Sequence, residues 1–244
     1  MYNLLERYRQ AIRDLCENVD TRCENIVKAG EMIAESVANG GAIHLSNIAH
    51  HIQHDLIGRG GGLALYKHFN YELKVENGGV FERDRSGIKR NTEGLARYAL
   101  EASNVMPGDV LVVSSVSGRT LPVVDLAWEA KKFGVKVIAL ISMEYAQVVD
   151  PVHSSGQKLY EFADVVLDNC APAAEAMLDV EGIDVKFAAA SGISSAYIMW
   201  SVTAVALEAL MAKGLTPAVY MSGNMPGGWE RLEKTNKDYR TRGY

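Results

Sequence analysis

The chain of 244 residues has only three cysteines, and no two of them form a CxxC pair. This scarcity argues against a disulfide framework and against a zinc knuckle, and it favours the reducing cytosol. The first ten residues carry Glu6, Arg7 and Arg9 and lack the apolar core of a secretory signal peptide. We therefore expect a cytoplasmic protein.

Positive charge is also in short supply. The formal net charge is −5, so the chain offers no general basic surface to nucleic acid. The stretch 187–207 has no charged residue at all, which raises the alternative of a membrane-spanning helix. Its serines and its threonine make it too polar for a span. We expect a buried helix there, and neither a nucleic-acid nor a membrane partner.

Internal repeats and low-complexity linkers are absent, and 48% hydrophobic residues suffice to build one large core. We expect a single domain over 1–244, with an N-terminal helix within 1–39 and a polar tail over 215–244. Apolar residues recur at spacings of three and four over 3–38, which predicts one long helix. Its length favours packing on a second subunit. The alternative is a helix, broken at Gly30, that wraps its own domain.

Strand patterns alternate with helix patterns along the rest of the chain. We expect strands at 42–45, 63–69, 111–113, 135–141 and 164–168, and helices at 50–57, 91–103, 121–133 and 191–213. This order indicates an α/β protein whose parallel sheet is covered on both faces. Ligands bind such sheets beyond the carboxyl ends of the strands, so the loops after the first, third and fourth strands should meet.

Small polar residues crowd into the turn between the third strand and the next helix, at Ser115, Ser117, Gly118 and Thr120. Free backbone N–H groups, the positive end of the helix dipole and these hydroxyls together favour an anion such as phosphate. Arg119 could clamp an acidic substrate with two hydrogen bonds, or it is a solvated arginine at a helix start. The alternative for the whole turn is an ordinary strand-to-helix connection that uses glycine to bend.

The run from Ser115 to Thr120 reads S-x-S-G-x-T and resembles the SIS (sugar isomerase) domain, which binds phosphosugars. Other segments are similar to the UPF0309 and phosphoheptose isomerase-like families of SIS proteins, namely 107–111, 136–140, 153–156, 163–169 and 220–224. The resemblance implies a three-layer α/β/α sandwich with a five-stranded parallel sheet, and a homodimer. It also implies that Ser115, Ser117 and Thr120 hold the sugar phosphate, while Gly118 lets backbone amides approach it.

The turn after the first strand departs from the family. SIS proteins usually carry G-x-G-x-S there, whereas this chain reads SNIAHH over 46–51. The expected sugar contacts are Ser46, Asn47 and His50, and the bulkier turn would crowd the sugar or change its pose. The departure leaves room for a binding or regulatory protein as well as for an enzyme.

Aldose–ketose isomerisation needs a base and an acid, and histidine and carboxylate side chains suit both roles at neutral pH. The candidates are Asp55, His51, His153 and Glu93. Family members often use a late-helix histidine, but the helix at 191–213 has none. Structural alternatives exist: the histidine cluster that includes His51 can be a partly exposed helix face, Asp55 can pair with Arg59, and Glu93 can face a helix dipole.

His50 and His54 are four residues apart, as zinc ligands on a helix are, but the sequence assures no third ligand. We expect neither a metal nor a cofactor. The leading hypothesis is a sugar-phosphate isomerase that works through an enediol. The alternative is a non-catalytic sensor that binds a phosphosugar.

Overall fold

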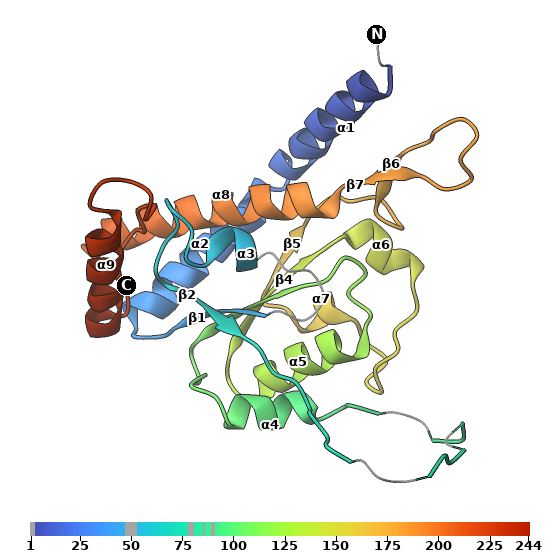
Figure 1. The fold of residues 1–244 in the computed structure, drawn as a ribbon, viewed down its shortest axis with the longest axis horizontal. Coiled ribbons are helices and arrows are strands. Elements are labelled where there is room, and N and C mark those ends of the chain that lie inside the picture. Colours follow the sequence, from blue (N-terminus) through green and yellow to red (C-terminus); the bar gives the residue numbers. More distant parts are fainter. Residues whose placement is uncertain (1–2, 47–52, 78–80, 85, 89–90) are drawn as a thin grey trace.

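A computed structural model describes residues 3–46, 53–77, 81–84, 86–88 and 91–244 (Figure 1). Five parallel strands form one sheet in the order β2-β1-β3-β4-β5. Their bounds are Ile43–Ser46 for β1, Tyr66–Phe69 for β2, Val110–Ser114 for β3, Lys136–Ile141 for β4 and Val165–Asp168 for β5. The predicted five-stranded parallel sheet is confirmed.

Helices cover both faces of the sheet, because alternate strand residues point to opposite sides. On one face Ile43, Val110 and Val112 pack against α2 (Cys23–Ala38) and α8 (Ser191–Ala212). On the other face Leu111 and Val113 pack against α4 (Leu95–Glu101) and α5 (Leu121–Lys132). The result is the predicted three-layer α/β/α sandwich.

The helix expected over 3–38 is divided into α1 (Asn3–Asp20) and α2. The break falls at Thr21 and Arg22 rather than at Gly30. The Thr21 Oγ1 and the Arg22 Nη1 both donate to the carbonyl of Asn18, each at 2.7 Å. Side chains that bond to nearby carbonyls compete with the helix ladder, which explains a stop at this point.

The apolar helix expected after residue 190 is α8, which by length and composition alone could cross a membrane. It lies instead along α2, and Ile198, Met199 and Val202 are part of the core. Gly30 of α2 makes this close approach feasible, since a Cβ there would lie 2.6 Å from the Cβ of Val205. α8 is therefore a core helix of this fold.

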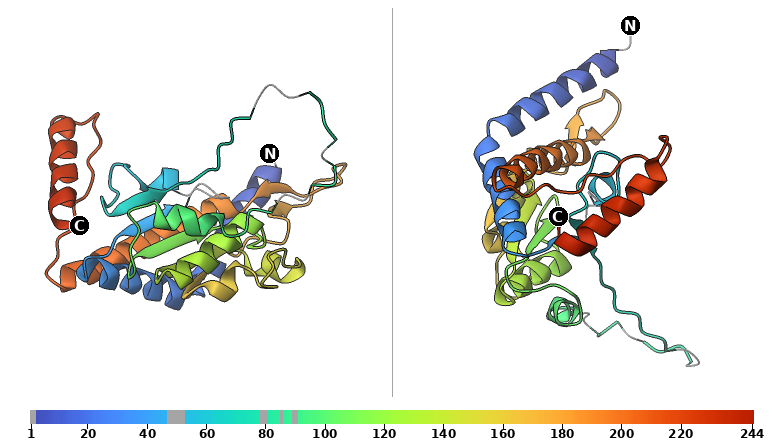
Figure 2. Two further views of the ribbon diagram at one scale, coloured as in Figure 1. Left: turned by 90° about the horizontal axis from the view of Figure 1, so that it is seen from below. Right: turned by 90° about the vertical axis from the view of Figure 1, so that its left-hand side faces the viewer.

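Several elements extend beyond the sandwich. α1 projects away from the body beside a hairpin of β6 (Ala176–Leu178) and β7 (Phe187–Ala189), which the sequence did not predict (Figure 1). The Arg7 Nη2 joins the two by donating to the carbonyl of Asp179 at 2.6 Å. α9 (Gly228–Arg242) lies at the other end, and both views in Figure 2 show residues 70–77, after β2, leading away from the body.

The described residues also form the short helices α3 (Gln53–Leu56), α6 (Met143–Val148) and α7 (Leu159–Phe162). Two predicted elements are shorter than expected. The strand expected over 63–69 begins only at Tyr66, because Leu63 forms an antiparallel bridge with Val219 instead. The helix expected over 91–103 begins at Leu95, after Gly94 at a φ of 84°.

Candidate functional site

The loop from Ser115 to Thr120 joins β3 to α5 at the carboxyl edge of the sheet. Ser115 is buried, and its Oγ accepts a hydrogen bond from the N–H of Gly118 at 3.2 Å. Gly118 has a φ of 61°, and a methyl group there would collide with the Cδ1 of Ile141. Glycine is thus required both by the backbone conformation and by the close approach of β4.

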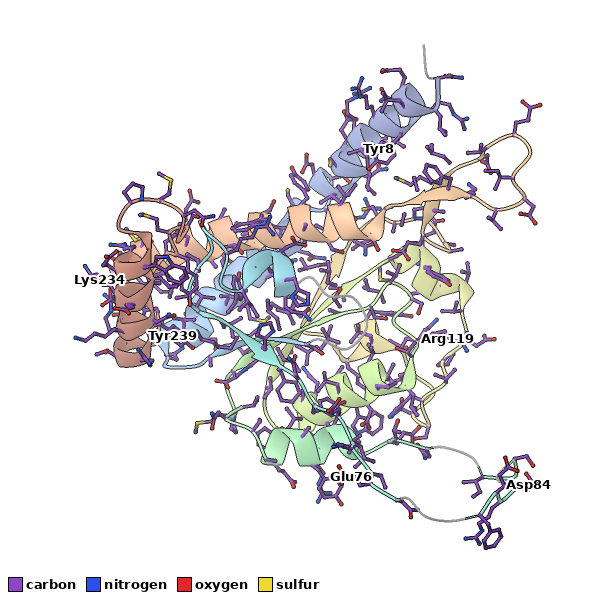
Figure 3. The ribbon with its side chains drawn as sticks, in the orientation of Figure 1. Tyr8, Glu76, Asp84, Arg119, Lys234 and Tyr239 are labelled. Carbon is purple, nitrogen blue, oxygen red and sulfur yellow. The ribbon has the colours of Figure 1, made fainter. Side chains whose placement is uncertain are left out.

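The remaining predicted phosphate ligands surround the start of α5. Ser117 is half-buried, and Thr120 is exposed at the N-cap position, where its side chain makes no capping hydrogen bond. Both hydroxyls therefore flank the positive end of a 12-residue helix. Figure 3 shows Arg119 on the outer side of the molecule, and within the part of the chain that is described it forms no ion pair.

The loops after β4 and β5 close in on this loop. The N–H of Ser142 donates to the carbonyl of Val116 at 3.0 Å, and its Oγ donates to the carbonyl of Ala171 at 2.5 Å. Val116, Ala171 and Ala190 then pack in one small buried cluster. The start of α8 consequently lies next to the loop from Ser115 to Thr120.

A strained segment connects β5 to α8. Four residues other than glycine, namely Cys170, Ala174, Glu175 and Ala188, have φ values between 56° and 78°. Each such residue costs on the order of 1–3 kcal/mol, and such strain is concentrated at functional sites. The half-buried Glu175 accepts a hydrogen bond from the Oγ of Ser191, the first residue of α8. Sequence reasoning missed Glu175, because no motif or periodicity marks the stretch 169–190.

Glu93 and His153, two of the predicted catalytic residues, lie in one cluster on the α4 and α5 side. The Oε1 of Glu93 accepts a hydrogen bond from the N–H of Ser154 at 2.9 Å, and hydrogen bonding with the side chain and the backbone of Ser154 lowers the pKa of Glu93. The His153 Nε2 lies 3.8 Å from the Oδ1 of Asp125, and its ring centroid lies 5.2 Å from that of Trp128. Two carboxylates and an imidazole therefore share this cluster.

Asp125 holds the cluster together from within α5. Its buried carboxylate accepts hydrogen bonds from the N–H groups of Gly94 at 2.8 Å and Ala96 at 3.2 Å, which caps α4. Burial, and then the charge of Asp125, raise the pKa of Tyr71. Sequence reasoning missed Asp125 as well. The available signal was a carboxylate between Val124 and Leu126, on the apolar side of a helix pattern.

Asp55 lies apart from this cluster. It belongs to α3, whose Leu56 packs into the core on the α2 and α8 side of the sheet. The Oδ1 of Asp55 is 3.0 Å from the Nη1 of Arg59, and both side chains are about half exposed. Within one chain, Asp55 and His153 thus lie on opposite sides of the sheet.

The turn after β1 can be described only at its first residue. Ser46 is buried at the end of β1, whereas Asn47, His50 and His51 lie outside the described residues. The ring of His54 is 6.5 Å from that of His68. Among the described residues, no three His, Cys, Asp or Glu side chains gather as metal ligands.

These features identify the class of protein. The chain is a three-layer α/β protein in which a hydroxyl-rich loop precedes a helix at the carboxyl edge of the sheet. Residues 7–142 match the SIS domain family. A UPF0309 protein of Streptomyces griseus is 34% identical over 225 residues, covering 91% of this chain and 89% of that protein. The UPF0309 protein BH3325 of Halalkalibacterium halodurans is 34% identical over 230 residues, covering 93% of each chain. The chain belongs to the SIS domain family and, within it, to the UPF0309 proteins.

A solved structure agrees with this fold. The phosphoheptose isomerase GmhA from Neisseria gonorrhoeae matches with a TM-score of 0.52 at 17% identity, over 86% of this chain and 97% of that one. At this identity the similarity supports the fold alone.

Proposed function

We propose that the protein binds a sugar phosphate at the loop from Ser115 to Thr120 and isomerises it in the cytoplasm. The observation that carries the proposal is the geometry of this loop. Gly118 brings the backbone close to β4, and the hydroxyls of Ser117 and Thr120 flank the positive end of α5. A phosphate monoester accepts hydrogen bonds from such N–H groups and hydroxyls. Membership of the SIS domain family supports the same ligand class.

The proposed reaction exchanges an aldose and a ketose. A base removes the proton from the hydroxyl-bearing carbon beside the carbonyl, and an acid protonates the carbonyl oxygen to give an enediol. The protonated base then delivers the proton to the former carbonyl carbon, while the neighbouring hydroxyl returns its proton to the conjugate base of the acid and becomes the new carbonyl. The candidates remain Asp55, His51, His153 and Glu93. Glu175 joins them, because it lies at the start of α8, beside the phosphate loop.

A homodimer is part of this proposal. Asp55 and His153 lie on opposite sides of the sheet within one chain, so a site that used both would have to draw on two copies. α1 extends away from the body and carries exposed apolar residues such as Leu5, which supports it as the contact between copies (Figure 1).

A sensor that binds a phosphosugar without converting it is the second candidate. Two features of the sequence around the site support this candidate. The turn 46–51 has none of the glycines that SIS proteins usually carry there. The first turns of α8 contain Ser191, Ser194 and Ser195, and the helix contains no histidine. Product formation from a bound sugar phosphate distinguishes the enzyme from the sensor.

The test combines titration calorimetry with a panel of sugar phosphates and one double variant. Ser117→Ala with Thr120→Ala should weaken binding at least about tenfold, since two hydroxyl donors to a charged group are lost. Thr241→Ala is the matched control, because its hydroxyl bonds only within α9. Unchanged affinity in the double variant would remove the site assignment.

A further inference from the structure

A cavity of about 660 Å³ lies on the α4 and α5 side of the sheet, beside the edge strand β2. Its walls come from β1, β2, the end of α4 and Tyr239 of α9. α4 has seven residues, and the chain that follows it, as far as Val105, forms part of the same wall. Figure 3 shows Tyr239 next to these strands, far from Arg119 of the phosphate loop.

Polar side chains lie on the face of the sheet that lines the cavity. His44 in β1 and Lys67 in β2 are neighbours in register and both line the cavity. The Nε2 of the buried His44 lies 2.9 Å from the Oδ2 of Asp109. Asp109 also accepts hydrogen bonds from the N–H groups of Ala42 at 2.8 Å and Met106 at 2.9 Å. Its carboxylate is therefore fully engaged by His44 and by the turns before β1 and β3.

The amine of Lys67 lies against an aromatic ring. Its Nζ lies 3.5 Å from the ring centroid of Tyr239, a cation–π arrangement. Burial lowers the pKa of this amine. Within the described part of the chain no carboxylate forms an ion pair with Lys67. A half-buried ammonium without an anion is unfavourable, and an anionic ligand would correct this.

We propose that this cavity is a second ligand site, which takes a small organic anion consisting of a phosphate or carboxylate on a flat apolar body. The anionic group pairs with Lys67 beside His44. The flat body packs among the rings of Phe69, Tyr71 and Tyr239, which also line the cavity. The volume lies within the range of about 300–1,000 Å³ that small-molecule sites occupy.

This site is separate from the phosphate loop. His44 is in register with Leu111, three residues before the end of β3 at Ser114. Three residues correspond to about 10 Å along a strand, and β2 lies about a further 10 Å across the sheet from β3. The proposal therefore does not depend on the sugar-phosphate function.

Calorimetry with phenyl phosphate and with benzoate as probes tests the site, and benzyl alcohol serves as the uncharged control. We expect saturable binding of at least one anion and none of the alcohol. Lys67→Met should weaken binding at least about tenfold, because it removes the charge and keeps an apolar stem. Lys74→Met is the matched control, since Lys74 is exposed and its Nζ lies 2.6 Å from the Oε1 of Glu76. The absence of binding by both anions at millimolar concentration overturns the proposal.

Two further measurements distinguish binding at the proposed cavity site from binding at the phosphate loop. The Ser117→Ala, Thr120→Ala variant should bind the aromatic anions as the wild type does. If it loses them while Lys67→Met retains them, the probes bind at the phosphate loop and the proposal fails. In the wild type, trace acetylation followed by mass spectrometry should show Lys67 protected by the bound anion and Lys74 unaffected. An unprotected Lys67 contradicts the proposal even if Lys67→Met does not fold.

Discussion

Gly118 offers a sharp test of how the phosphate loop is built. Gly118→Ala adds one methyl group to a residue with a φ of 61°, at a place where the Cδ1 of Ile141 already occupies the space. The left-handed conformation costs an alanine about 1–2 kcal/mol. Overpacking against a buried side chain adds about 1–3 kcal/mol. We therefore expect the free energy of unfolding to fall by about 2–5 kcal/mol.

Gly156→Ala is the matched control for the backbone term. Gly156 has a φ of 71°, and no atom lies within 4 Å of the position that a Cβ would take. Urea unfolding should therefore show a loss of only about 1–2 kcal/mol for this variant. A Gly118→Ala loss no larger than that of Gly156→Ala would refute the close approach of β4 to the loop.

A third variant isolates the packing term. Ile141→Val removes the Cδ1 that the new methyl group meets, and alone it costs about 0.5–1.5 kcal/mol. Combined with Gly118→Ala, it should cost less than the sum of the two single variants, because it relieves the collision. Strict additivity would mean that the two side chains do not meet.

Three further predictions concern stability and assembly. The hydrogen bonds from Ser154 depress the pKa of Glu93 below its ordinary 4.5, so its stabilising contribution is complete above pH 4.5 and disappears as the pH falls through the lowered value. Glu93→Gln should flatten this acid decline in urea midpoints, and an unchanged slope argues against the contact. Asp125→Asn should cost about 1–3 kcal/mol in the same assay, since an amide cannot replace both buried acceptor oxygens, and a neutral result would contradict its capping role. Leu5→Glu with Tyr8→Glu should convert the proposed homodimer into monomers in light scattering, and a dimer that forms despite both changes would exclude α1 as the contact.

Much of the fold was predictable because the apolar pattern is strong. β3 and β4 are buried almost throughout, and their continuous apolar runs predicted the bounds of both strands to within a residue or two. The sheet's parallel arrangement followed from the alternation of strands and helices. The division of the N-terminal helix was not predictable in the same way. It depends on Thr21 and Arg22 bonding to the carbonyl of Asn18, while the apolar spacing continues across the break.

The sequence predicted the candidate functional site only where a local motif marks it. The Ser–Gly loop sits between a strand and a helix N-terminus as its spacing indicated. Asp125 and Glu175 escaped sequence reasoning because their roles depend on contacts with the chain 29 and 16 residues away, at Ala96 and Ser191. The cavity at Lys67 is lined by residues of β1, β2, the chain after α4 and Tyr239 of α9. It was not predictable from the sequence, because these segments lie far apart along the chain.

The most direct measurement of the central claim is thermal unfolding of the purified protein across a panel of sugar phosphates, with the unphosphorylated sugars as controls. A ligand that binds only the folded state raises the midpoint by mass action. The account predicts that at least one sugar phosphate raises the midpoint, that its free sugar does not, and that Ser117→Ala with Thr120→Ala abolishes the shift. The same shift with the free sugar, or none with any sugar phosphate, would contradict a phosphate site at this loop.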